Sequence, residues 1–240
     1  MSPVALHTLF EALAYIVGFQ AFLFLQRRAP HVPLADRDAR LAVIAGAILG
    51  AAMGSKLAYW IDDPLTAFAA FPDPRALMQG KSIVGGLLGG LAGVEIAKKR
   101  AGVRESTGDA FALPLVAGMI VGRIGCHLAG VSDHTAGLPV AWGYDYGDGV
   151  PRHPTALYEI AFLLALGAAL ARTRVVRDGD RFRAFMVAYL AFRFAIEFLK
   201  PVPFAYFGAL SGLQLLCIAG LAYYHRDVIR LARGLAWRTS

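Results

Sequence analysis

The chain has 240 residues, a formal net charge of +7 and an unusually apolar composition. Hydrophobic residues make up 57% of it, charged residues only 17%, and the mean hydropathy is +0.53. Because a soluble domain carries about 25% charged residues, this composition excludes an ordinary soluble domain and indicates a membrane protein. The two cysteines, Cys126 and Cys217, lie in apolar stretches and do not indicate a disulfide framework.

Seven apolar stretches follow one another along the chain. A helix needs about 20 apolar residues to cross the hydrocarbon core of a bilayer, and most of these stretches approach that length. The third is short and rich in glycine. The sequence therefore predicts an all-α fold in which residues 1–240 form one membrane domain with about seven transmembrane helices. The predicted helices cover residues 7–26, 40–60, 82–97, 108–129, 155–171, 184–199 and 207–225.

The basic residues are distributed asymmetrically between the predicted loops. Of the 24 Lys and Arg residues, 17 belong to the loops after the first, third, fifth and seventh helices, and four belong to the opposite loops. Loops on the cytoplasmic side of a membrane are enriched in Lys and Arg. We therefore expect the N-terminus outside and the C-terminus in the cytoplasm. The basic residues are spread over four loops without a nucleic-acid motif, which argues against a nucleic-acid partner.

Three cations remain inside the predicted helices: Lys56, Arg123 and Arg193. A charged side chain at bilayer depth costs roughly 3 kcal/mol or more, so it is usually retained for a function. The apolar stretches contain few acidic residues that could neutralise these cations. This pattern predicts a pocket for an anionic group.

Arg123 lies between Gly122 and Gly125 at the end of the fourth stretch. One interpretation is a cation that snorkels to the interface or has a structural partner. The favoured interpretation is functional, because the glycines would open space around a guanidinium that can grip a phosphate with two hydrogen bonds.

Arg193 and Glu197 are four residues apart and so share one face of the sixth helix. They could simply neutralise each other within the bundle. Alternatively, Glu197 orients Arg193 toward a ligand.

Gly85 and Gly86 open the third helix. Small residues let transmembrane helices approach closely, and they also leave backbone amides accessible to a phosphate. Taken alone, the motif favours packing.

The segment Arg152–Glu159 leads into the fifth helix, and its Pro154 and Thr155 suit a helix start. It could be no more than a helix entry at the interface. His153 could instead exchange protons near neutral pH.

Cys126 and His127 follow Arg123, with Asp133 and His134 further on. The spacing lacks a second cysteine pair or an H-E-x-x-H helix, so no metal site is predicted. A thiol nucleophile helped by histidine is one alternative. The favoured interpretation is a small buried cysteine and a histidine used in packing or in a polar pocket.

These motifs together resemble the prolipoprotein diacylglyceryl transferase family, in the right order over most of the chain. No single fragment is decisive, but the combination is specific. The matching segments are Pro3–His7 and Tyr15–Phe19 at the start, Gly85–Gly89, Gly122–Gly125, Arg152–Glu159, Phe192–Phe198, and Gln214 as the polar residue of the last helix.

The resemblance implies a seven-helix, multi-pass enzyme of the bacterial inner membrane. Such an enzyme moves the diacylglyceryl group of phosphatidylglycerol, an anionic phospholipid, onto the lipobox cysteine of a preprolipoprotein. A thioether forms and glycerol phosphate leaves. No metal or organic cofactor is implied. Arg123 and Arg193 are expected to hold the lipid phosphate, and the other expected substrate-binding residues are Lys56, Gly85, Gly86, Gly122, Gly125, Tyr158, Glu159 and Gln214.

Several positions depart from the family pattern. Val84 stands where the family has a histidine, Cys126 and Ala129 replace asparagines, Val131 replaces a glutamate, and Lys200 replaces an arginine. A thiol with a pKa of about 8.5 still needs a base at neutral pH. The candidates are His127, His153, Glu11 and Glu159, and the sequence does not choose among them.

The departures leave two alternatives open. The first is the same lipid chemistry with an acceptor other than a lipoprotein, such as a small molecule, a glycan or a lipid. The second is a non-catalytic protein that binds or transports lipid.

The predicted topology is tested by reporter fusions. Fusions after residue 103 and after residue 178 should report the cytoplasm, and a fusion near residue 145 should report the outside, because of the asymmetry in Lys and Arg. A cytoplasmic signal from the fusion near residue 145 would contradict the helix count and would place His153 on the cytoplasmic side of the membrane.

Overall fold

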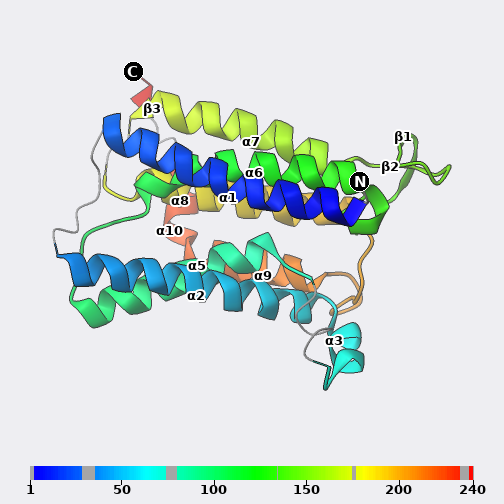
Figure 1. Ribbon diagram of the computed structural model, residues 1–240, viewed down its shortest axis with the longest axis horizontal. Helices are drawn as coiled ribbons and strands as arrows, with labels where there is room; N and C mark the ends of the chain where they lie inside the picture. The colour runs from blue at the N-terminus through cyan, green and yellow to red at the C-terminus, as the bar shows by residue number, and fades with distance from the viewer. Residues whose placement is uncertain are drawn as a thin grey trace. The chain divides into compact units, whose positions relative to one another are not determined.

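The computed structural model describes residues 3–28, 36–73, 80–133, 135–174, 177–232 and 238–239, and most of these residues are helical (Figure 1). Every one of the seven predicted stretches contains a helix. A short helix between the second and third stretches and another after the seventh were not predicted. The helices are α1 (Pro3–Arg28), α2 (Arg37–Asp62), α3 (Pro64–Ala70), α5 (Ile83–Ala101), α6 (Asp109–Ala129), α7 (Thr155–Arg172), α8 (Asp180–Ile196), α9 (Gly212–Tyr223) and α10 (His225–Ala232), with 3-10 turns η1 (Gly130–Asp133) and η2 (Glu197–Leu199).

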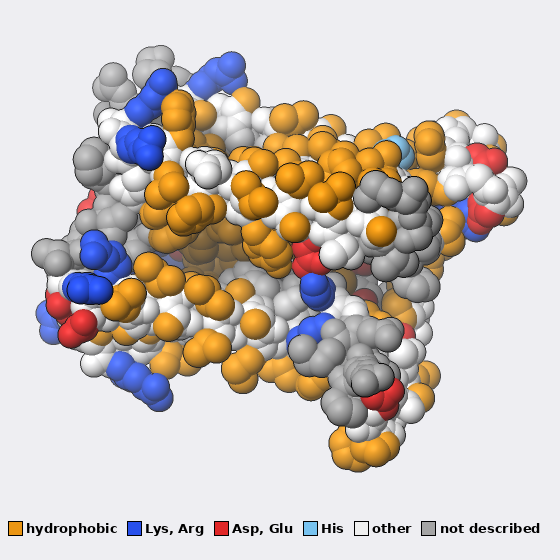
Figure 2. Space-filling view, viewed as in Figure 1, with side chains coloured by type: hydrophobic (Ala, Val, Ile, Leu, Met, Phe, Trp, Pro, Cys, Tyr) orange, Lys and Arg blue, Asp and Glu red, His pale blue; other side chains and the backbone are white. Residues whose placement is uncertain are grey.

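Four of the described helices, α1, α2, α6 and α7, are long and apolar enough to cross a membrane. Large hydrophobic side chains stay exposed along them, for example Ile16 and Phe19 of α1 and Ile48 and Met53 of α2. Figure 2 shows hydrophobic side chains along the visible sides of α1 and α2. An exposed apolar surface of this extent suits contact with lipid. The prediction of an all-α membrane protein is confirmed at this level, and the number of seven spans stays a prediction.

The structure also contains short strands, which the sequence did not predict. β1 (Pro139–Asp145) and β2 (Pro151–Arg152) form an antiparallel hairpin, and β3 (Thr173–Arg174) pairs with β4 (Arg238–Thr239). The carboxylate of Asp145 accepts hydrogen bonds from the amides of Gly147 and Gly149 at 2.8 and 3.0 Å. Both glycines have positive φ, a conformation that closes the hairpin and that glycine adopts without strain.

The chain forms two compact units. The first, called unit 1, contains Met1–Val32, Ser106–Pro201 and Arg226–Ser240, and the second, called unit 2, contains Pro33–Glu105 and Val202–His225.

In unit 1, α6 packs against α1, α7 and α8. The contact with α1 is close because a Cβ placed on Gly118 would lie 2.9 Å from the carbonyl oxygen of Ala14. The carboxylate of Asp109, at the start of α6, accepts hydrogen bonds from the amides of Gly179 and Phe182 at 2.7 and 2.9 Å. These bonds fix the start of α8 against α6.

In unit 2, α2 and α5 lie side by side over most of their length (Figure 1). Gly46, Gly50 and Gly54 of α2 face Gly93, Gly89 and Gly85 of α5, and a Cβ on any of the six would meet the backbone of the opposite helix. α9 packs on both helices, and Asp62 accepts a hydrogen bond from the amide of Leu213 at 3.0 Å. The predicted last helix begins later than expected, at Gly212, because Ser211 and Gln214 form a capping box.

The glycine contact predicts a strong difference between two neighbouring alanine substitutions in α5. Gly89→Ala would place a Cβ 2.7 Å from the Cα of Gly54, whereas Gly90→Ala would meet its nearest atoms at an ordinary 3.5 Å. Overpacking of this kind costs about 1–3 kcal/mol. We expect Gly89→Ala to lower the thermal unfolding midpoint in detergent and Gly90→Ala to leave it nearly unchanged. Equal midpoints for the two variants would contradict the close contact.

Candidate anion-binding site

Five charged side chains gather in unit 1, and we call them the charged cluster: Arg123, Glu159, Arg193, Glu197 and Lys200. They come from α6, α7, α8, η2 and the residue after η2. The first four are between 1% and 7% exposed. Charges so deeply buried are tolerated only when they are paired and hydrogen-bonded.

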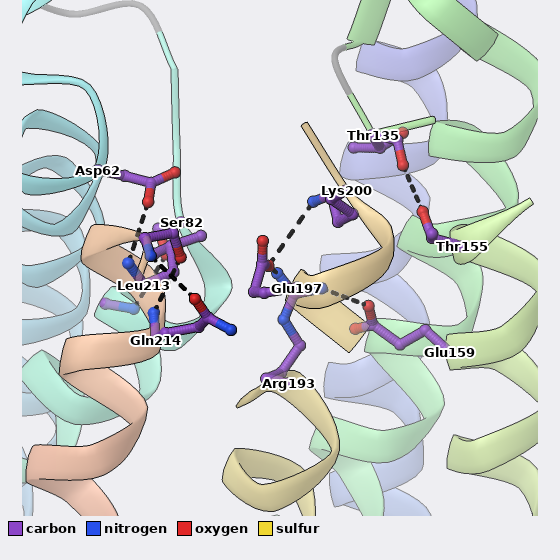
Figure 3. Close-up of polar contacts among 12 residues, drawn as sticks. Asp62, Ser82, Thr135, Thr155, Glu159, Arg193, Glu197, Lys200, Leu213 and Gln214 are labelled. Atoms are coloured by element: carbon purple, nitrogen blue, oxygen red, sulfur yellow. Dashed lines mark hydrogen bonds and ion pairs between the residues drawn. The ribbon is translucent and has the colours of Figure 1, made fainter. Parts of the chain in front are cut away.

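Glu159 connects the two arginines, and Figure 3 shows its contact with Arg193. Its Oε2 accepts a hydrogen bond from Arg193 Nη1 at 3.1 Å, and its Oε1 lies 2.9 Å from Arg123 Nε. The N–H of Arg123 does not point at that oxygen, so this contact is an ion pair without hydrogen-bond geometry. Tyr189, fully buried in α8, donates its hydroxyl to the same Oε1 at 2.8 Å. One carboxylate thus fixes two guanidinium groups.

The predicted contact between Arg193 and Glu197 is present. Nη2 of Arg193 donates to Glu197 Oε1, and Nζ of Lys200 lies 3.8 Å from the same oxygen (Figure 3). Tyr189, Arg193 and Glu197 are spaced four residues apart, so they project from one face of α8 and its continuation.

With Lys200 protonated, the charged cluster holds three cations and two carboxylates, so one positive charge is left over. Within the described part of the chain, Nε of Arg193 is also buried without a hydrogen-bond partner. A buried excess charge and an unsatisfied donor are both costly. Together they suit the binding of one anionic group.

Each of the two candidate histidines lies beside aromatic residues. Nδ1 of His127 is 3.3 Å from the hydroxyl of Tyr146, and Nδ1 of His153 is 3.3 Å from the hydroxyl of Tyr158. Burial raises the pKa of Tyr146, which keeps that hydroxyl protonated. Trp142, from the hairpin, contacts the His153 ring edge-on at a centroid distance of 5.0 Å.

No hydrogen bond or ion pair joins either histidine to the charged cluster among the described residues. Glu11, the remaining base candidate outside the cluster, accepts a hydrogen bond from Tyr15 in α1 at 3.4 Å. Glu159 is held by two guanidinium groups and a hydroxyl, and this geometry supports a positioning role rather than proton transfer.

The glycines beside Arg123 have a different use from the one expected. A Cβ on Gly125 would collide with Phe10 of α1, and a Cβ on Gly122 would meet Ala14 of the same helix at 3.7 Å. They let α1 approach α6. The expectation that they open space around the guanidinium is therefore wrong for Gly125, whose free space is filled by an aromatic side chain.

The other predicted site residues belong to unit 2, where their contacts are structural. Lys56 donates to the carbonyl of Gly80 at 2.6 Å, Gly85 packs against Gly54, and Gly86 makes only ordinary contacts. The side-chain oxygen of Gln214 accepts from the amide of Ser211 at 2.9 Å in the capping box.

Val84, at the position of the family histidine, is buried. The side chains of Asp133 and His134 lie outside the described residues. Among the residues that are described, no group of His, Cys, Asp and Glu could hold a metal ion.

Tyr189 and the bridging role of Glu159 were missed from the sequence. A signal for Tyr189 was available, since it lies one helical turn before Arg193 and on the same face. The partnership of Glu159 with Arg193 joins residues 34 apart, and no local pattern indicates it.

The fold and the site define a helical membrane protein with a buried charged cluster that contains two arginines. The model of the prolipoprotein diacylglyceryl transferase family matches residues 2–225, and the chain belongs to this family.

Curated relatives carry the name phosphatidylglycerol–prolipoprotein diacylglyceryl transferase. The chain is 34% identical to the relative from Geobacter sulfurreducens over 223 residues, covering 83% of this chain and 80% of the relative. It is 32% identical to the relative from Nitratidesulfovibrio vulgaris over 229 residues, covering 86% and 83%. It is 30% identical to the relative from Paracidovorax citrulli over 236 residues, covering 88% and 84%.

Removing the charge of Glu159 should destabilise the protein. Glu159→Gln leaves the charged cluster with one carboxylate instead of two. Breaking a buried ion pair in this way costs about 3–5 kcal/mol. The matched control is Glu95→Gln, whose carboxylate is half-exposed and pairs with Lys98 at 3.1 Å. Such a pair contributes about 0–1 kcal/mol. In a denaturing detergent, Glu159→Gln should unfold much more readily than Glu95→Gln. Equal stabilities of the two variants would contradict the bridging role.

Proposed function

We propose that this protein transfers the diacylglyceryl group of phosphatidylglycerol to the thiol of a lipobox cysteine in a preprolipoprotein. A thioether forms and glycerol phosphate leaves. The observation that carries the proposal is the pair of buried arginines joined by Glu159, on a chain that belongs to this family. The names of the relatives supply the lipid and the acceptor.

Arg123 and Arg193 bind the lipid phosphate with the N–H groups that Glu159 does not use. Charge grows on the phosphate as its bond to the glyceryl carbon breaks, and fixed cations in a low-dielectric site stabilise that charge. The carboxylate of Glu159 and the hydroxyl of Tyr189 hold the guanidinium groups in place before the lipid arrives. Preorganisation of this kind avoids reorientation during the reaction.

The same proposal extends to the membrane arrangement. The chain acts as one domain of about seven spans in the bacterial inner membrane, with its N-terminus outside and its C-terminus in the cytoplasm. Support comes from the family match over residues 2–225, which includes helices of both units, and from the four long apolar helices. The asymmetric distribution of Lys and Arg supports the orientation.

The arginine pair is tested with labelled phosphatidylglycerol and a lipobox peptide. Arg123→Ala and Arg193→Ala should each lower turnover by about 10²–10³-fold, the loss typical of a donor that stabilises developing charge. Arg123→Lys should also fail, because an ammonium cannot form a two-pronged contact with phosphate. Arg172→Ala, at an exposed position at the end of α7, is the control and should retain activity. Normal turnover by a folded Arg193→Ala variant would reject the assignment.

A further inference from the structure

Lys200 is fixed in place by backbone hydrogen bonds at the end of η2. Its amide donates to the carbonyl of Glu197 at 3.1 Å, and the carbonyl of the preceding Leu199 accepts from Leu138 at 2.7 Å. The carbonyl of Leu138 in turn accepts from the amide of His153 at 3.1 Å. These bonds connect the segment after α8 to the segment before α7. The side chain is only 12% exposed and points toward Glu197 (Figure 3).

The ammonium of Lys200 is the most weakly held charge of the charged cluster. Its distance of 3.8 Å to Glu197 Oε1 exceeds hydrogen-bond range. That oxygen already accepts a hydrogen bond from Arg193. Lys200 is therefore a buried cation that shares its counter-ion with a better-placed guanidinium.

Lys200 is also the cation of the charged cluster that can lose its charge. Arginine stays protonated at any pH that a protein meets, because its pKa exceeds 12. When Lys200 gives up its proton, two cations face two carboxylates and the excess charge disappears. In agreement, the pKa of Lys200 is lowered, first by burial and then by the nearby Arg193, with Glu197 opposing the shift.

We propose that the uncharged ε-amine of Lys200 takes the proton from the acceptor thiol in the transfer reaction. This inference rests on the proposed function. The S–H bond breaks and its proton moves to Nζ. The thiolate forms a C–S bond to the glyceryl carbon, and the C–O bond to phosphate breaks with its electron pair leaving on glycerol phosphate. The new ammonium then balances the additional negative charge of that leaving group.

The neighbourhood supports Lys200 over the other candidates for this role. The charged groups that face it are Arg193 and Glu197, with Arg123 and Glu159 behind them. None of the four is free to accept a proton, because the guanidinium groups are already charged and each carboxylate is engaged by a guanidinium. Among the described residues, no hydrogen bond or ion pair joins His127 or His153 to these groups, and each histidine contacts a tyrosine hydroxyl instead.

The kinetic test compares Lys200→Arg with Lys200→Met and an exposed control, Lys99→Arg. Lys200→Arg keeps the positive charge but cannot act as a base, so kcat/KM should fall by about 10²–10⁴-fold, the usual contribution of proton transfer. Wild-type kcat/KM should rise with pH through the titration of Lys200, and both Lys200 variants should lose this dependence. An active Lys200→Arg variant with the wild-type pH profile would overturn the proposal.

A second measurement reports the charge of Lys200 without any turnover. The chain has five lysines, which can be labelled by reductive methylation with ¹³C-formaldehyde and titrated by NMR, with Lys200→Arg identifying the signal. The Lys200 signal should titrate at clearly lower pH than that of Lys99. Titration together with Lys99 would overturn the proposal even if the variant is inactive. A shifted signal in a protein that releases no glycerol phosphate with the lipobox peptide would instead reject the proposed function.

Discussion

The carboxylate of Glu159, held between two buried guanidinium groups, is the interaction on which unit 1 depends. Arginines inside apolar helices must be paired with an anion, and here one residue of α7 serves Arg123 of α6 and Arg193 of α8 at once. Each arginine is thereby fixed on a neighbouring helix. Sharing one carboxylate also leaves guanidinium N–H groups that Glu159 does not use, and these are the groups that we propose to bind an anion.

Unit 2 is organised by a different constraint. In lipid there is little hydrophobic drive between helices, and association depends on close packing. Glycines at four-residue intervals, Gly46, Gly50 and Gly54 on α2 and Gly85, Gly89 and Gly93 on α5, bring the two backbones into contact. Gly85 belongs to a motif that could also have bound a phosphate through its backbone amides, but here it packs against Gly54 of α2. Backbone atoms enclosed by a neighbouring helix are not available to a ligand.

The sequence predicted what local patterns encode. Apolar length located seven helices, and four-residue spacing placed Arg193 beside Glu197. Long-range partners were not accessible, since Glu159 contacts residues 30 and 34 positions away. The role of Gly125 depends on Phe10 of a different helix, and the capping use of Gln214 depends on where α9 begins. Local sequence patterns do not show which helices become neighbours. Reading them identified these residues as unusual but did not give their contacts.

The departures from the family pattern acquire a physical meaning once the charged cluster is known. A cation that stays protonated at any pH that a protein meets suits the stabilisation of charge on a phosphate, and the two arginines are such cations. Moving a proton requires the opposite, a group whose charged and uncharged forms are close in free energy. Val84 cannot provide this, and Cys126 is engaged as a weak acceptor for Arg123 at 3.6 Å. Lys200 stands in place of an arginine and is buried beside a carboxylate that another cation already occupies. It places such a group beside the arginines that we propose to bind phosphate. Unlike an arginine at this position, Lys200 can lose its charge.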